Sequence, residues 1–125
     1  MAKPEPKSDP GRFAYGGLER VIHERARLSI LASVAAHDGG LLFTELKGLC
    51  QLTDGNLSRQ LTTLAEAGLV ETWKGTRNGR PQTLVKLTAA GRKRFADYIA
   101  ELEAVVTDAR RSAAAPTGRT RPSTA

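Results

Sequence analysis

The sequence has a single cysteine, Cys50, among its 125 residues. One cysteine cannot form an intramolecular disulfide, and it cannot build a cysteine-rich zinc site. Histidine is almost as scarce, because His23 and His37 are the only two, so a histidine-based metal site has few ligands to draw on. These shortages argue against a metalloprotein and against a disulfide-stabilised fold, and we expect no metal and no cofactor.

Long apolar runs are missing as well. The longest uncharged stretch is far shorter than the ~20 residues that cross a bilayer, and the first residues lack the apolar core of a secretory signal. Aromatic residues make up only 5% of the chain, and they form no obvious platform on which RNA bases could stack. We therefore expect a soluble, cytoplasmic protein without membrane contact.

Both ends of the chain contain little that could enter a hydrophobic core. Residues 1–11 and 111–125 are rich in Pro, Ser, Thr, Gly and Ala, a composition that predicts a disordered N-terminal tail and a disordered, basic C-terminal tail. Residues 12–110 remain for one folded domain, which is a length that supports a single core.

Positive charge exceeds negative charge. Lys and Arg total 19 and Asp and Glu total 13, so the formal net charge is +6. The excess is concentrated in residues 73–94, which contain seven basic side chains and no acidic one. A localised basic segment favours a polyanionic partner, and nucleic acid is the commonest such partner.

Apolar periodicity and turn residues predict a mostly helical chain with a small β-hairpin. The predicted elements are a helix over 18–37, a short strand over 41–43, helices over 45–50 and 54–67, strands over 69–74 and 83–87 joined by a loop over 75–82, and a helix over 88–110. The expected N-caps of the last three helices are Thr44, Thr53 or Asp54, and Thr88. Gly68 is expected to follow the end of the third helix as its C′ residue.

The two middle helices are joined by the tight segment 51–53, which is typical of a helix-turn-helix. The basic hairpin follows the second of these helices directly, in the position of the wing of a winged helix. The predicted fold is therefore a winged helix-turn-helix of order α-β-α-α-β-β-α. Its long C-terminal helix, over residues 88–110, is expected to serve in dimerisation.

Five segments carry a family resemblance. They are LERVIHE at 18–24, FTEL at 43–46, LTDGNLS at 52–58, LAEAGLV at 64–70 and LTAAGR at 87–92. In this order they resemble the winged-helix transcriptional regulators of bacteria and archaea, most closely the short proteins related to the MarR and ArsR groups. The resemblance implies DNA binding. ArsR relatives often sense metals through a Cys-x-Cys pair that this chain lacks, and MarR-like relatives often bind phenolic ligands, so a small-molecule effector is left open.

The helix over residues 54–67 has two distinct faces. Leu57, Leu61 and Leu64 fall on one face, which predicts the buried side. Short polar and guanidinium groups near a helix N-terminus suit the major groove, where Arg can bind guanine and Asn or Gln can bind adenine. The candidate base-reading residues are Asn56, Ser58, Arg59, Gln60 and Thr63.

A second group of residues is expected to contact the DNA backbone or the minor groove. Arginine at the tip of a wing can enter the narrow minor groove, where the potential is most negative. The group is Thr53, Lys74, Arg77, Arg80 and Arg92. Within the basic run 92–94, either phosphate contact or the need for a soluble surface would explain cations at a helix N-terminus. The only tryptophan, Trp73, is expected to pack the wing against the domain.

The last helix carries more apolar surface than a domain of this size needs for its own core, at a spacing close to a heptad seam. Pairing with the same helix of a second chain would place two reading helices about one DNA turn apart, matching a palindromic site. The expected interface comprises Phe13, Tyr15, Leu18, Val21, Phe95, Tyr98, Ile99, Leu102, Val105 and Val106. The alternative is a helix that covers only its own core.

The sequence indicates no enzyme, because His23, His37, Asp38 and Cys50 form no recognisable set of nucleophile, base and orienting group. We expect a homodimer that binds double-stranded DNA sequence-specifically and regulates transcription as a repressor. Two alternatives remain open at this point. One is a winged-helix module that binds an acidic protein partner, and the other is RNA binding.

Overall fold

The computed structural model describes residues 9–113, so most of both predicted tails lies outside the described residues. The elements are α1 (Arg25–Ala35), β1 (Leu41–Leu42), α2 (Phe43–Cys50), α3 (Asp54–Glu66), β2 (Val70–Arg77), β3 (Arg80–Leu87) and α4 (Ala89–Ala113). The predicted order α-β-α-α-β-β-α is confirmed. Helix α4 continues three residues past its predicted end, into the segment expected to begin the C-terminal tail.

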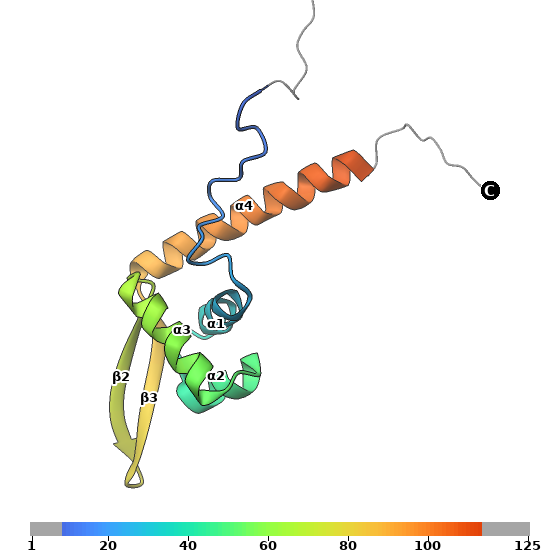
Figure 1. Ribbon diagram of the computed structural model, residues 1–125. Coiled ribbons are helices and arrows are strands. Elements are labelled where there is room, and N and C mark those ends of the chain that lie inside the picture. Colours follow the sequence, from blue (N-terminus) through green and yellow to red (C-terminus); the bar gives the residue numbers. More distant parts are fainter. Residues whose placement is uncertain (1–8, 114–125) are drawn as a thin grey trace, which may run out of the picture.

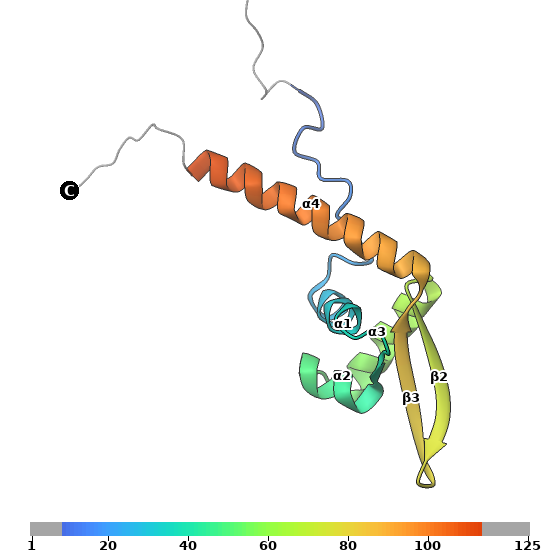
Figure 2. The same cartoon turned by 180° about the vertical axis from the view of Figure 1, so that it is seen from behind.

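A three-stranded antiparallel sheet of order β1-β3-β2 packs with α1, α2 and α3. Figure 1 shows the β2–β3 hairpin projecting beyond the helices, while α4 leaves from the opposite end of the hairpin; Figure 2 shows the same arrangement from behind. Most of the fully buried side chains come from α1, α2, α3 and the sheet, including Leu31, Leu46, Leu57 and Val85, and Tyr98 of α4 joins them. The core therefore holds α3 and the hairpin in a fixed relation.

The first helix is shorter than predicted. It begins at Arg25, because Glu24 has extended backbone angles and its carboxylate accepts a hydrogen bond from the Arg27 N–H at 2.9 Å. The preceding residues form turns, although Ile22 among them is fully buried. The apolar spacing over 18–24 thus reflects burial of an irregular segment, and the prediction of helix there is wrong.

The helix caps are confirmed in two cases and wrong in one. The Thr53 hydroxyl accepts from the Asn56 N–H at 3.1 Å, and the Thr88 hydroxyl accepts from the Gly91 N–H at 2.8 Å, as N-caps do. Gly68 follows the α3 C-cap with a φ of +78°, as predicted. Helix α2, in contrast, begins before Thr44, with Leu42 as its N-cap residue.

The wing is a continuous ribbon rather than two short strands around a long loop. Strands β2 and β3 pair without a break from Val70–Leu87 to Arg77–Arg80, so the prediction of a loop over 75–82 is wrong. Asn78 and Gly79 turn the chain with φ angles of +54° and +76°, which is the two-residue turn favoured by Asn-Gly. At about 3.4 Å per residue, eight-residue strands make a wing roughly 27 Å long.

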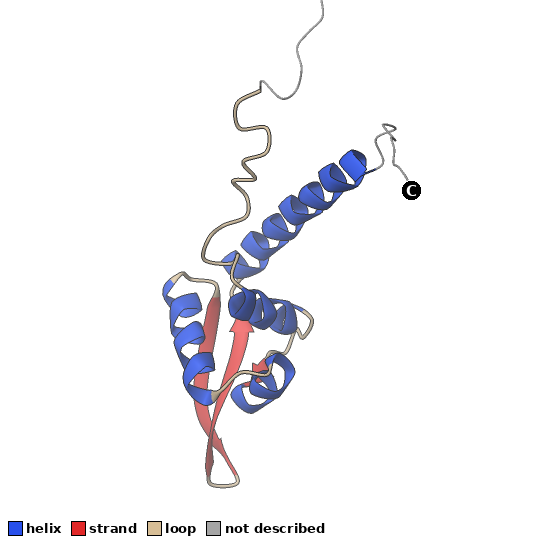
Figure 3. Ribbon diagram, turned by 45° about the vertical axis from the view of Figure 1, so that its right-hand side comes forward, coloured by secondary structure: helices blue, strands red, loops and turns tan. Residues whose placement is uncertain are grey.

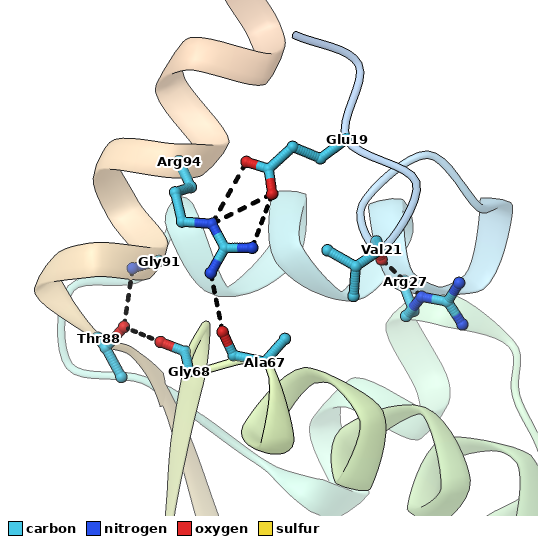
Figure 4. A network of polar contacts seen from close by, with 8 residues as sticks. All are labelled: Glu19, Val21, Arg27, Ala67, Gly68, Thr88, Gly91 and Arg94. Carbon is cyan, nitrogen blue, oxygen red and sulfur yellow. Dashed lines mark hydrogen bonds and ion pairs between the residues drawn. The ribbon is translucent and has the colours of Figure 1, made fainter. Parts of the chain in front are cut away.

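The root of the wing, the end of α3 and the start of α4 are joined by polar contacts (Figure 4). Arg94 donates to the Glu19 carboxylate at 2.7 Å and to the Ala67 carbonyl oxygen at 2.8 Å. The Thr88 hydroxyl donates to the Gly68 carbonyl at 2.6 Å. Arg94 is therefore committed to internal contacts, so the run 92–94 does not act as one free cationic cluster.

The segment before α1 is fixed to the distal half of α4. Arg12 donates two hydrogen bonds to the Asp108 carboxylate, at 3.0 and 3.1 Å, and the Tyr15 hydroxyl donates a third at 2.6 Å. The Gly17 N–H donates to Glu101 at 3.0 Å. The hydrogen bonds from Arg12, and next the one from Tyr15, lower the pKa of Asp108 to about 2. The N-terminal segment and α4 thus form one surface.

The ion pair of Asp108 predicts that the docking of the N-terminal segment on α4 depends on pH. A lowered folded-state pKa means that Asp108 stabilises the docked segment above its ordinary pKa of 3.8, and that this contribution is lost as the pH falls towards about 2. We expect slow hydrogen exchange at the Leu18 amide, which donates to the Tyr15 carbonyl oxygen at 2.9 Å, from pH 7 down to about 4, and fast exchange in Asp108→Asn at pH 7. Glu103→Gln, on an exposed position of α4, is the matched control and should change nothing. Equal protection in Asp108→Asn and the wild type would refute the assignment.

Candidate nucleic-acid interface

The outward face of α3 is polar and centred on Arg59. Leu57, Leu61 and Leu64 are buried, as predicted, and Arg59 projects from the opposite side of the helix. Ser58 and Arg59 are exposed, whereas Asn56, Gln60 and Thr63 are partly buried. Gly55 and Thr62 share the outward face, and neither is among the predicted base-reading residues. A helical wheel centred opposite the three leucines would have included them.

Two of the candidate base readers are held in a hydrogen-bonded chain. Arg27 of α1 donates to Gln60 Oε1 at 2.9 Å, and Gln60 Nε2 donates to Asn56 Oδ1 at 3.0 Å. A guanidinium N–H of Arg59 also approaches Asn56 Oδ1, at 3.4 Å. Arg27 lies 33 positions before Gln60, so sequence spacing gave no sign of its role.

The structure brings Lys74 next to α3. A groove of about 290 Å³ separates α3 from the hairpin, with Ser58 and Thr62 on the helix side and Lys74 on the strand side. Figure 3 shows α3 running alongside the hairpin in this way. An ammonium group at this place lies beside the polar face of α3 and adds positive charge to the same surface.

The tip of the wing carries the two arginines that were predicted there. Arg77 and Arg80 are cross-strand partners next to the turn, and both are exposed. They border a groove of about 570 Å³ whose other wall is the start of α2, at Phe43 and Thr44. Because the wing is a paired ribbon, the two guanidinium groups are carried by ordered backbone rather than by a long loop.

Trp73 does not pack the wing against the domain, so that expectation is wrong. Its side chain is 46% exposed on β2. The Lys86 ammonium group lies 5.9 Å from the centre of its ring, within the range of a cation–π contact. Lys86 thereby adds a further cation to the hairpin, between the root of the wing and the tip arginines.

The two remaining residues that were predicted to contact the DNA backbone, Thr53 and Arg92, lie far apart in the structure. Thr53 is exposed at the N-terminus of α3, beside the outward polar face of that helix. Arg92 lies in the first turn of α4, at the root of the wing, and its guanidinium is 3.8 Å from the Asp38 carboxylate. The length of the hairpin, about 27 Å, separates it from the tip arginines. The structure therefore does not place Arg92 with the other candidates.

The predicted dimer residues fall into three groups. Phe95 and Tyr98 are only 8% and 1% exposed, because they belong to the chain's own core, so for these two the prediction is wrong. Leu18, Val21, Ile99 and Leu102 are partly buried against that core. Phe13 and Val106 are exposed, and Tyr15 and Val105 are half-buried. Exposed apolar surface thus remains on the distal half of α4 and the N-terminal segment.

Residues 9–113 contain no cluster of three His, Cys, Asp or Glu side chains that could hold a metal ion. In the same part of the chain, no helix has the length and apolarity needed to cross a membrane. Cys50 is half-buried, with its sulfur 3.6 Å from the Ser33 hydroxyl.

A helix-turn-helix, a β-ribbon wing with exposed cations and a long C-terminal helix define a winged-helix protein of the transcriptional-regulator type. The family model described as "Winged helix DNA-binding domain" matches residues 26–106. The chain belongs to this family.

The chain is also similar to individual proteins. An uncharacterised protein of Methanocaldococcus jannaschii, MJ0432, is 47% identical over 86 residues, which are 66% of this chain and 89% of that protein. Among solved structures, the transcriptional regulator homologue from Pyrococcus horikoshii OT3 superposes with a TM-score of 0.68 and 26% identity, over 73% of this chain and 89% of that one. The S. aureus MepR–DNA complex shares the fold, with a TM-score of 0.63 and 20% identity over 80% of this chain and 81% of MepR.

Proposed function

We propose that the protein is a homodimeric transcriptional repressor that binds double-stranded DNA sequence-specifically at a palindromic operator. The observation that carries the proposal is the polar face of α3 beside a wing whose cations are exposed. Figure 3 shows the helix running alongside the hairpin. This arrangement suits a helix in the major groove and arginines in the adjacent minor groove. The likeness to a regulator solved with DNA supports the same docking.

In this proposal each element has a distinct task. Helix α3 reads bases through Arg59, which is assisted by its neighbours Asn56, Ser58, Gln60 and Thr63. Lys74, Arg77, Arg80 and the Thr53 hydroxyl contact the backbone or the minor groove. Arg92 is left outside this contact set, because it lies at the far end of the wing and beside Asp38.

Arg59→Ala is expected to weaken binding to the cognate operator by about 1–3 kcal/mol and to leave binding to random duplex almost unchanged. The reason is that arginine discriminates bases through paired hydrogen bonds to guanine. Random duplex does not present guanine at the required position, so these bonds contribute little there. Equilibrium titration against both duplexes measures the two effects. Arg110→Ala, which removes the same charge from exposed α4, is the control and should alter neither. An equal loss on both duplexes would exclude Arg59 from base reading.

The homodimer is tested by light scattering. We expect twice the chain mass of 13.4 kDa for the wild type. Val106→Glu should yield the single-chain mass, because it puts a carboxylate on the exposed apolar part of α4 that we propose as the contact. A single-chain mass for the wild type at micromolar concentration would contradict the proposed dimer.

The exposed wing cations would also suit an acidic protein partner, which is the alternative function suggested by the sequence. The two functions differ in the role of α3. A protein partner held by charge alone gives no reason for Arg59→Ala to affect one DNA sequence more than another, whereas base reading requires that difference.

A further inference from the structure

The amide groups on α3 are oriented by a residue of another helix. Arg27 Nη1 donates to Gln60 Oε1 at 2.9 Å, and Gln60 Nε2 then donates to Asn56 Oδ1 at 3.0 Å. The Arg27 side chain is itself anchored, because its Nε donates to the Val21 carbonyl oxygen at 2.6 Å (Figure 4). Arg27 is therefore the fixed end of a chain that runs to the reading face.

The hydrogen bonds from Arg27 through Gln60 to Asn56 can run in only one direction. A guanidinium has donors and no acceptor, so Gln60 must turn its amide oxygen towards Arg27 and its NH2 group towards Asn56. Asn56 must then turn its oxygen towards Gln60. That oxygen also faces a guanidinium N–H of Arg59 at 3.4 Å, so both of its lone pairs have donors.

As a result, Asn56 and Arg59 present hydrogen-bond donors on the outward face of α3. Within residues 9–113 the Asn56 NH2 group donates no hydrogen bond, and it is free to bind DNA. The neighbouring Arg59 is exposed and has donors only. An asparagine that reads adenine needs its oxygen to accept from the adenine amino group while its NH2 donates to N7. Here that oxygen is already engaged.

We propose that Arg27 is a positioning residue which, through Gln60, holds the Asn56 NH2 group as a donor beside Arg59 and so makes the protein select guanine over adenine at the base that Asn56 faces. Guanine offers two acceptors, O6 and N7, in the major groove, whereas adenine offers one acceptor and one donor. The inference rests on the proposed function, and it replaces the expectation that Asn56 and Gln60 read adenine.

The test is selection of duplexes from a fully randomised pool by the full-length protein, followed by sequencing of the bound fraction. The base position governed by Asn56 is the one whose preference disappears in Asn56→Ala. At that position we expect the wild type to favour guanine over adenine by about tenfold or more, the discrimination typical of a good base contact.

Two substitutions separate positioning from a structural role. Arg27→Lys keeps a donor-only group facing Gln60, and it should retain the guanine preference. Arg27→Met removes the donor, so Gln60 and Asn56 can turn their amides over, and adenine should rise to within about threefold of guanine. A merely structural role would instead lower affinity for all sequences and leave this ratio unchanged. Circular dichroism confirms that each variant is folded.

The outcomes distinguish this inference from the function on which it rests. A pool in which the wild type enriches no sequence overturns sequence-specific binding and the inference together. An enriched motif with adenine at the Asn56 position, or a guanine preference that is identical in folded Arg27→Met, overturns the inference alone and leaves the proposed function standing.

Discussion

Replacing Arg77 and Arg80 together by alanine is expected to weaken DNA binding by the proposed dimer about 10³-fold at 0.15 M salt. Both guanidinium groups are exposed at the wing tip, and neither forms an ion pair within residues 9–113. Their positive charge is therefore available to displace counterions from DNA. Each contact contributes about 0.9 to the slope of log K against log salt, so four contacts in a dimer contribute between three and four.

The measurement is a series of binding titrations between about 0.05 and 0.3 M salt, read as that slope. The double variant should have a slope smaller by three to four than the wild type. Arg110→Ala with Arg111→Ala removes the same charge from the distal end of α4 and should leave the slope unchanged. A wing variant with the wild-type slope would place the wing away from DNA.

Gly91→Ala is expected to destabilise the fold strongly. A Cβ at this buried position would overlap the Leu69 carbonyl oxygen and lie 2.8 Å from its carbonyl carbon. That carbonyl is fixed, because it accepts from the Thr88 N–H at 3.1 Å. Helix α4 would have to move off the root of the wing. We expect a loss of about 3 kcal/mol, the upper part of the usual range for overpacking, and a Tm lower by about 15 °C.

Gly48→Ala is the matched control for this prediction. Gly48 lies inside α2, is exposed, and would place its new Cβ in open space. Alanine favours helix over glycine by up to ~1 kcal/mol, so this variant should match or exceed the wild-type Tm. If thermal unfolding followed by circular dichroism gave Gly91→Ala the same Tm as Gly48→Ala, the close approach of α4 to Leu69 would be wrong.

The elements of the fold could be predicted where residues close together in the sequence determine the local structure. Three buried leucines at helical spacing, the Thr53 cap and the Gly68 stop defined α3 nearly to the residue. The strands of the wing were harder to predict, because Pro81 and a run of polar residues over 75–82 are typical of a loop. The Asn-Gly pair at 78–79 carried the correct signal, since both residues tolerate the positive φ of a two-residue hairpin turn.

The candidate site could be proposed from residue types alone, but the hydrogen bonds that connect its residues could not. Polarity identified Asn56, Arg59 and Gln60, yet the contact from Arg27 that orients two of them joins separate helices and leaves no local pattern. Which apolar residues of α4 are buried was equally hard to predict. Phe95 and Tyr98 share helical spacing with residues exposed further along, and only tertiary packing shows that they belong to the chain's own core.

The most direct test of DNA binding is an equilibrium titration of the wild-type protein against a labelled duplex from the region upstream of its own gene, at 50 and at 200 mM salt. Several phosphate contacts from α3 and the two wings predict an affinity that falls about 10³-fold or more between these salt concentrations. An affinity that does not change with salt, or no binding at 50 mM salt with protein at about 10⁻⁴ M, would contradict the account, since even non-specific DNA-binding proteins bind duplex in that range.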